Sequence, residues 1–144
     1  MGLQDKLSSF RDNKLNEEKQ KGAEFLAANK NNQGVVELPG GIQYLVVKEG
    51  NGEKPMPNSK IKAHYRGKLL SGKEFDSSYR RNQPFTASLT QLIQGWQDVI
   101  PMMPVGSIWR LWIPSHLAYG DRGAGGDIPG GATLEFEIEL LEIV

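Results

Sequence analysis

LEFEIEL, residues 134–140, alternates strictly between apolar and acidic side chains. Successive side chains of a β-strand point to opposite faces, so this stretch predicts a strand with one buried face and one carboxylate face. Residues 60–66 and 107–113 also alternate between two faces. Because strands buried on one face are typical of antiparallel sheets, we expect an antiparallel sheet. Its acidic face is expected to lie across from Lys60, Lys62 or Arg110.

A short helix is expected to interrupt these strands at residues 91–100. Its apolar side chains follow helical spacing, at Leu92, Ile93, Trp96, Val99 and Ile100. Thr90 is a suitable N-cap, and Pro101 stops the helix from continuing. One short helix can cover a sheet only if the sheet curves around it. The sequence therefore predicts an α+β fold, with a curved antiparallel β-sheet wrapped around one short α-helix.

The first 33 residues differ in composition from the rest of the chain. They contain no Val, Ile or Pro and are rich in Lys, Glu, Gln and Asn. A helix is expected over residues 17–29, anchored by Phe25 and Leu26, and so thin an apolar face either packs on the next domain or belongs to a larger helical module. Earlier apolar side chains at helical spacing are Leu3, Leu7 and Phe10. We expect a helical N-terminal extension over residues 1–33 and one domain over residues 34–144.

The overall composition argues against several kinds of partner and site. Lys and Arg total 17, as do Asp and Glu, so no net field draws the chain to nucleic acid or anionic lipid. There is no Cys to form a disulfide or bind zinc, and no apolar run reaches the roughly 20 residues of a membrane span. Without an apolar signal core, the sequence as written predicts a cytoplasmic protein. Met1–Gly2 is equally compatible with a removed signal peptide and a periplasmic or cell-envelope location.

Short motifs of common catalytic and binding sites are incomplete in this chain. Residues 67–73 have most of a phosphate-binding loop, but Glu74 stands where Ser or Thr would bind magnesium, so we expect a hairpin turn. His64 and His116 lack the acidic support of a metal site, and no metal is expected. The Gly-rich residues 120–126 are interpreted either as a flap over a cleft or as a flexible connection.

Several aromatic residues stand beside turn residues at the ends of apolar runs, where side chains tend to line a cleft. They are Tyr65, Phe75, Phe85, Trp96, Tyr119 and Phe136. Without clustered His or paired catalytic carboxylates, this set predicts a site that acts through shape and dehydration, with no cofactor. Trp96 suits both a core position and a pocket floor. Asp76 is either the cap of a turn or part of a pocket rim.

Longer motifs follow one another through residues 36–144. They are HYxG (64–67), GKEFDSS (72–78), NxPF (82–85), LIQGW (92–96), VG (105–106), AYG (118–120) and IPxGATLxF (128–136). In this order they resemble the FKBP-type peptidyl-prolyl isomerases, the macrolide-binding immunophilins. Residues 22–29 and 34–40 are similar to the end of the long linker helix in the macrophage-infectivity-potentiator branch of that family, whose helical N-terminal module forms dimers.

The resemblance implies a peptidyl-prolyl cis-trans isomerase that assists protein folding by acting on proline-containing polypeptides. It further implies binding of macrolide inhibitors and a homodimer through the N-terminal helix. From charge and hydropathy, we expect neither nucleic acid nor membrane as a partner. Two other functions compete with this interpretation. One is a non-catalytic chaperone or polypeptide-binding module, and the other is a scaffold that joins helical partners through residues 1–33.

The resemblance also implies roles for the pocket residues. The aromatic walls and floor would come from Tyr65, Phe75, Phe85, Trp96 and Phe136. Leu92 and Ile93 would line the mouth, and Ile93 would offer a backbone N–H. Tyr119 would donate its hydroxyl and Ile128 its N–H to substrate carbonyls.

Asp76 would lie near the twisting amide, with Arg81 beside it. In the twisted transition state an amide loses resonance and its carbonyl becomes less polar, so an apolar pocket favours it over the planar amide. No bond needs to break in this mechanism. Ala87 departs from the family pattern, because well-studied human members often have a second Phe there, and this departure affects the outer binding surface.

Overall fold

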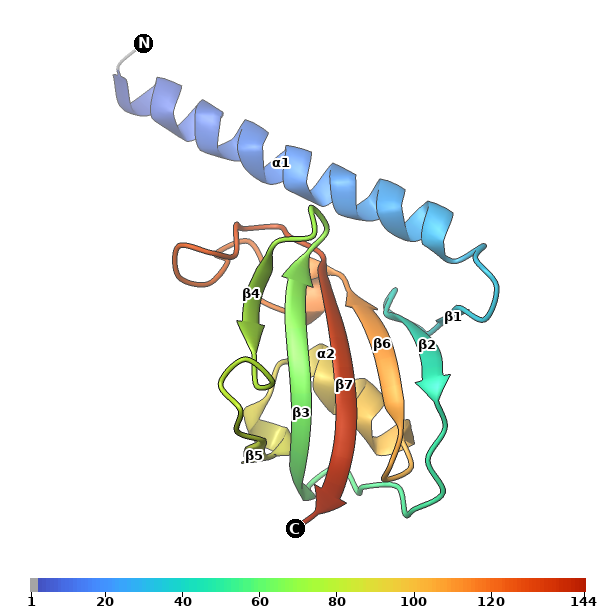
Figure 1. The fold of residues 1–144 in the computed structure, drawn as a ribbon. Helices are drawn as coiled ribbons and strands as arrows, with labels where there is room; N and C mark the ends of the chain where they lie inside the picture. The colour runs from blue at the N-terminus through green and yellow to red at the C-terminus, as the bar shows by residue number, and fades with distance from the viewer. Residues whose placement is uncertain (1–2) are drawn as a thin grey trace.

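The computed structural model describes the backbone of residues 3–144, with the side chains of Ser9 and of residues 11–144. Its centre is a seven-stranded antiparallel sheet in the order β1-β2-β6-β7-β3-β4, with β5 also paired to β3 (Figure 1). The strands are β1 (Val36–Glu37), β2 (Gln43–Lys48), β3 (Lys60–Leu69), β4 (Glu74–Ser77), β5 (Phe85–Ser88), β6 (Ile108–Ile113) and β7 (Leu134–Ile143). The helices are α1 (Leu3–Asn29), α2 (Gln94–Val99) and the 3₁₀ turns η1 (Leu89–Gln91), η2 (Ile100–Met102) and η3 (Ser115–Leu117). The predicted α+β class is confirmed.

β7 lies between β6 and β3 and follows the alternation that the sequence predicts. The glutamates of this strand are partly exposed on the outer face of the sheet. The apolar side chains between them are buried, namely Leu134, Phe136, Ile138 and Leu140. The strand therefore supplies the core through one face, and Phe136 from that face reaches the functional site.

Basic side chains flank the acidic face of β7, as predicted for Arg110. Arg110 of β6 and Arg66 of β3 both pair in register with Glu137, and Arg66 Nε lies 3.9 Å from Glu137 Oε2. Lys62 and Lys60 lie farther along β3, opposite the end of β7 rather than the LEFEIEL stretch. Exposed pairs of this kind contribute about 0–1 kcal/mol each, so burial of the apolar face stabilises the sheet more.

α2 packs on the concave side of the sheet, behind the strands in Figure 1, but begins later than the sequence predicts. Its first residue is Gln94, so Thr90 is not its N-cap. Thr90 lies in η1 instead, where a reciprocal capping box satisfies the backbone, and Leu92 is extended. Leu92 and Ile93 therefore precede the helix rather than belong to it. Pro101 lies within η2, directly after α2.

α1 is a 27-residue helix that lies across the end of the sheet where β6 stops and β7 starts (Figure 1). It extends well before residue 17, the predicted start. Phe25 packs against Trp112 of β6, with ring centroids 6.4 Å apart, and Trp112 is only 4% exposed. Gly22 permits a close approach, since a Cβ there would lie 2.2 Å from Thr133 Oγ1. The side chains of Leu3, Leu7 and Phe10, which the sequence places at helical spacing, lie outside the described side chains.

No helix within residues 3–144 combines the length and the apolar composition that crossing a bilayer requires. α1 is long enough, but lysine, arginine and acidic side chains occur throughout it. The packing of its second half against Trp112 of β6 and against Thr133 favours the interpretation in which this helix covers the next domain.

Gln43 of β2 is 0% exposed, and its side chain hydrogen-bonds to the end of α1. Its amide nitrogen donates to the Leu26 carbonyl at 2.8 Å and to Glu37 at 3.0 Å, while its oxygen accepts from Asn29 at 2.8 Å. Gln43→Met would leave these partners unpaired, and we expect it to lower the free energy of unfolding by about 1–3 kcal/mol in denaturant titrations. Gln20→Met, on the exposed side of α1, should change that free energy by less than about 0.5 kcal/mol. Equal effects of the two substitutions would contradict this role for Gln43.

Candidate active site

A cavity of about 270 Å³ opens between α2 and the concave face of the sheet. It is lined by Tyr65, Phe75, Asp76, Phe85, Gln91, Leu92, Ile93, Trp96, Tyr119 and Phe136. Strands β3, β4, β5 and β7 supply one side, and α2 with the segment before it supplies the floor and part of the mouth. Sequence reasoning missed only Gln91 of this lining, because a polar side chain at the edge of a helical pattern carries no signal for a pocket.

Trp96 is the centre of a cluster of perpendicular rings. Its ring centroid lies 5.2 Å from Tyr65, 5.9 Å from Phe85 and 5.2 Å from Phe136, with interplanar angles of 77°, 85° and 87°. Phe75 packs on Phe136 in the same way, at 5.8 Å and 90°. Edge-to-face pairs contribute about 0.5–1.5 kcal/mol each beyond their buried area, so the floor is rigid. Trp96 is 5% exposed and also lines the cavity, so it serves as both core and pocket floor.

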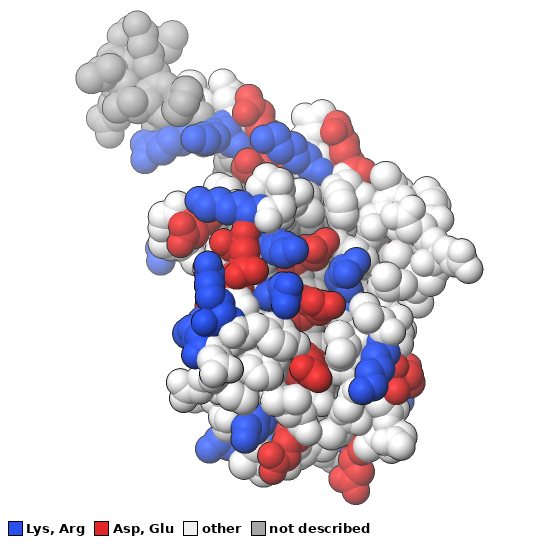
Figure 2. Space-filling view, in the orientation of Figure 1, with Lys and Arg blue, Asp and Glu red and all other residues white. Residues whose placement is uncertain are grey.

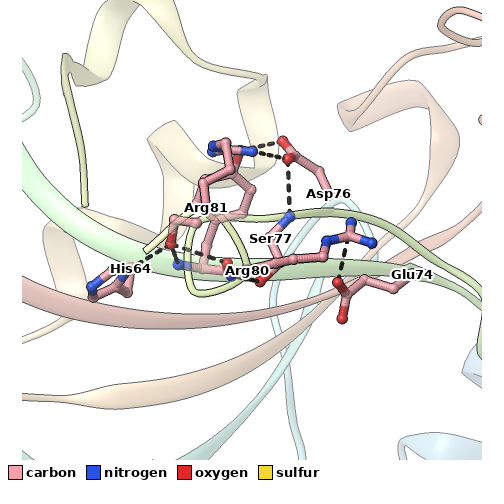
Figure 3. A network of polar contacts seen from close by, with 8 residues as sticks. His64, Glu74, Asp76, Ser77, Arg80 and Arg81 are labelled. Carbon is pink, nitrogen blue, oxygen red and sulfur yellow. Dashed lines mark hydrogen bonds and ion pairs between the residues drawn. The ribbon is translucent and has the colours of Figure 1, made fainter. Parts of the chain in front are cut away.

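Asp76, in β4, lines the cavity and bonds to Ser77 and Arg81 (Figure 3). Its carboxylate accepts hydrogen bonds from the Tyr65 hydroxyl and from Arg81, and its Oδ1 also accepts the Ser77 N–H at 2.9 Å. Arg81 Nη2 donates to the Tyr65 hydroxyl at 3.2 Å, which closes a three-residue network. Asp76 thus lies within β4, where it accepts the N–H of Ser77, and forms part of the cavity wall, one of the two alternatives that its sequence context left open.

This network keeps Asp76 charged and Tyr65 protonated. Burial alone would raise the pKa of the Asp76 carboxyl, but hydrogen bonds from Tyr65 and Arg81 and the Arg81 charge lower it below its ordinary value. Burial, followed by the hydrogen bond to Asp76, raises the pKa of Tyr65. Arg81 does not line the cavity itself, so its contribution to the site passes through Asp76 and Tyr65.

Tyr119 lies on the other side of the cavity and is 38% exposed. Burial, and to a smaller extent the negative charge of Asp76, raises the pKa of its phenol. The hydroxyl therefore remains a proton donor throughout the neutral range. Among the described side chains none is hydrogen-bonded to that hydroxyl, so the group is free to donate to a bound molecule.

Ile128 does not have the position that the family resemblance implies. It is buried and is not among the residues that line the cavity, and its N–H donates to the Ala124 carbonyl at 3.1 Å. Ala124 N–H returns a bond to the Ile128 carbonyl at 3.0 Å, so the two residues form an isolated β-bridge. The bridge closes residues 124–128 into a turn, so the predicted Ile128 donor is already in use.

Leu92 and Ile93 lie at the mouth of the cavity, as the resemblance implies. The Ile93 carbonyl accepts the N–H groups of Trp96 and Gln97, at 3.0 and 3.2 Å, and so starts α2. The Ile93 N–H is donated to no acceptor within residues 3–144. At this cavity the Ile93 N–H is therefore free to donate, whereas the Ile128 N–H is already bonded.

His64 lies on the outer face of β3, since it alternates with Tyr65, whose side chain lines the cavity. It stacks on Tyr79 at 4.5 Å and lies 2.8 Å from Ser78 Oγ, which also accepts the Tyr65 N–H at 2.7 Å. Burial and the hydrogen bond to Glu139 raise the pKa of Tyr79 to about 12. His64 is thus paired with Ser78 and Tyr79, and Ser78 connects this outer cluster to the backbone of Tyr65.

Charged side chains on the face shown in Figure 2 are mixed rather than segregated. Lys and Arg side chains alternate with Asp and Glu over β3, β4 and β7, and the pairs include Arg80–Glu74 at 3.2 Å and Lys73–Asp127 at 4.0 Å. Nucleic-acid sites need a continuous basic surface, and this face does not offer one.

Comparisons with known proteins agree with this geometry. Residues 51–141 match the family described as FKBP-type peptidyl-prolyl cis-trans isomerase, and residues 1–46 match the domain amino terminal to it. The chain is 47% identical over 127 residues to FkpA of Aeromonas hydrophila, named an FKBP-type peptidyl-prolyl cis-trans isomerase, across 88% of this chain and 47% of the relative. It is 40% identical over 141 residues to the outer membrane protein MIP of Legionella longbeachae, across 98% of this chain and 60% of the relative.

A solved structure shows the same fold. The crystal structure of FkpA from Escherichia coli matches with a TM-score of 0.90 and 34% identity, over 94% of this chain and 63% of that chain. The chain thus spans about half to three-fifths of the length of the curated relatives described above. By its sequence motifs, its ring-lined cavity and these matches, the chain belongs to the FKBP-type peptidyl-prolyl cis-trans isomerase family.

Proposed function

We propose that this protein catalyses cis–trans isomerisation of Xaa-Pro bonds in polypeptides and thereby assists protein folding. The observation that supports this most directly is the cavity of about 270 Å³, floored by Trp96 and walled by perpendicular rings. Xaa-Pro bonds interconvert over tens to hundreds of seconds, slowly enough to limit folding. The family to which the chain belongs is defined by this activity.

The proposed catalysis is non-covalent and follows from the polarity of the cavity. The planar amide is held by resonance, with a rotation barrier of about 18–20 kcal/mol. The apolar walls stabilise the twisted amide over the planar amide, and each 1.4 kcal/mol or so of that preference accelerates rotation about tenfold. The Tyr119 hydroxyl and the Ile93 N–H donate to carbonyls that flank the rotating bond, because buried unpaired carbonyls cost about 1–3 kcal/mol.

Asp76 is proposed to act on the rotating amide through its charge. The carboxylate stays ionised beside Tyr65 and Arg81 and lies on the cavity wall. The twisted amide nitrogen recovers its lone pair and the carbonyl carbon loses conjugation, so the charge distribution of the bond changes as it rotates. A fixed charge near the bond interacts differently with the two states, which is the requirement for catalysis.

The proposed mechanism predicts a flat pH profile. Asp76 has a lowered pKa, and Tyr65 and Tyr119 have raised pKa values, so none of them changes charge near neutrality. We expect kcat/KM on a peptide without titratable groups to stay constant from about pH 5 to 9. Exchange NMR at several pH values checks this expectation. An inflection between about pH 6 and 7 would point to a histidine and contradict the mechanism.

The activity itself is tested on short peptides that contain Leu-Pro or Phe-Pro. Exchange NMR should show faster cis–trans interconversion with the protein than without it. A macrolide that fills the cavity is expected to suppress the acceleration. Interconversion at the uncatalysed rate would overturn the enzyme proposal, and peptide binding without acceleration would leave the non-catalytic chaperone in its place.

Partners and location are part of the same proposal. Proline-containing polypeptides are the substrates, macrolides are inhibitors, and the chain forms a homodimer through its N-terminal helix, supported by the match of residues 1–46 to the family's amino-terminal domain. The proposed location is the periplasm or cell envelope, because one relative is named an outer membrane protein. Light scattering tests the dimer, and fractionation of cells that produce the native protein tests the location.

A further inference from the structure

The peptide group between Leu92 and Ile93 forms part of the cavity mouth. Its carbonyl accepts a hydrogen bond from one side chain that does not line the cavity. Gln97, on α2, donates from Nε2 to the Leu92 carbonyl at 2.7 Å. Its direction is unambiguous, because a carbonyl only accepts and the amide nitrogen of Gln only donates. Both residues of the peptide group line the cavity, whereas Gln97 does not.

Fixing the Leu92 carbonyl also fixes the Ile93 N–H. A trans peptide group is planar, so its C=O and N–H point in opposite directions, and no peptide bond within residues 3–144 is cis. The hydrogen bond from Gln97 orients the Leu92 carbonyl towards α2, so the Ile93 N–H points away from this helix. That N–H has no acceptor among the described residues, so it remains available to a carbonyl of a bound peptide.

The start of α2 does not need this side-chain bond. The Ile93 carbonyl already accepts the backbone N–H groups of Trp96 and Gln97. Gln94 provides a comparison on the same helix, because its Nε2 donates to Asp98 Oδ1 at 2.7 Å on the exposed side. The two glutamines therefore make bonds of equal length, but only the bond from Gln97 ends on a peptide group of the cavity.

We infer that Gln97 is a positioning residue, which orients the Ile93 N–H for donation to a substrate carbonyl by anchoring the Leu92 carbonyl. The inference rests on the proposed isomerase function. It assigns to Gln97 no contact with substrate, so its effect must pass through the Leu92–Ile93 peptide group. The chemistry recognised there is a carbonyl oxygen next to the prolyl bond.

Two substitutions of Gln97 test this role. Gln97→Met removes the donor at similar length, and Gln97→Glu keeps the shape but replaces the donor with a carboxylate that repels the Leu92 carbonyl. We expect each to lower kcat/KM for a Leu-Pro peptide by about threefold to tenfold, the value of one hydrogen bond. The matched control Gln94→Met should stay within about twofold of the unsubstituted protein.

Amide NMR separates positioning from a general loss of stability. In the unsubstituted protein, saturation with the Leu-Pro peptide should move the Ile93 amide proton downfield, and Gln97→Met should reduce that movement while the melting temperature stays close to that of Gln94→Met. Equal kcat/KM for the two Met variants, or no movement of the Ile93 amide in the unsubstituted protein, overturns the inference. The movement of the Ile93 amide is measured without any substitution, so a variant that fails to fold does not remove the test. An unsubstituted protein that accelerates nothing would instead overturn the proposed function.

Discussion

Replacing Phe136 by Ala is expected to lower the free energy of unfolding by about 3–5 kcal/mol, the usual cost of removing a buried Phe ring. The ring is 3% exposed and packs edge-to-face against both Trp96 and Phe75. Its loss would remove one of three ring partners from Trp96 and the edge-to-face partner of Phe75, and would open a void that joins the cavity. Denaturant titration at neutral pH measures the difference.

The same substitution should weaken catalysis in the protein that remains folded. A wider cavity admits water beside the prolyl ring and loses its preference for the twisted amide. Glu142→Ala is the matched control, because Glu142 is exposed on the same strand, and it should change stability by less than about 0.5 kcal/mol. A loss below about 1 kcal/mol for Phe136→Ala would show that the ring does not support the floor.

Replacing Asp76 by Asn is expected to lower kcat/KM by about tenfold to a hundredfold, the range for a hydrogen bond to a charged group. The substitution keeps the size of the side chain but removes the charge that Tyr65 and Arg81 hold in place. Exchange NMR on a Leu-Pro peptide measures the change. Asp98→Asn, which alters an exposed carboxylate on α2, is the control and should have little effect.

The outcome separates two roles of Asp76. If Asp76→Asn leaves kcat/KM unchanged but alters stability, the carboxylate is only a structural cap. Its lowered folded-state pKa means that ionised Asp76 contributes stability above its unfolded pKa of about 4, and that this stability is lost as pH falls through the lower folded pKa. The unsubstituted protein should therefore lose stability more steeply than Asp76→Asn below about pH 4, as thermal melts at several pH values would show.

The sheet could be predicted because its signal is local. Alternation along residues 134–140 requires no knowledge of neighbouring strands, and it placed Phe136 correctly on the buried face. Most of the cavity lining was predictable for a related reason, since the rings stand beside turns in motifs of fixed order. The position of Arg81 behind Asp76 also follows from closeness in sequence.

Other features depend on contacts that no local pattern records. Thr90 is a residue type that suits an N-cap, but it lies inside the 3₁₀ turn η1. The helix α2 therefore starts only at Gln94. The Ile128 N–H is used by a bridge to Ala124, which only the folded loop reveals. In the sequence Gln97 is an ordinary polar helix residue. Only the fold shows that its side chain donates to the Leu92 carbonyl, five residues earlier.

The packing of α1 against Trp112 has a practical consequence for anyone who wishes to work with the catalytic portion by itself. A fragment that starts at Val35 would lack Phe25, which covers the Trp112 indole. It would also lack Asn29 and Leu26, which hydrogen-bond to Gln43, and would expose an apolar surface at this end of the sheet. We expect such a fragment to aggregate through this exposed apolar surface. Starting it near residue 15 would retain the turns of α1 that shield this surface.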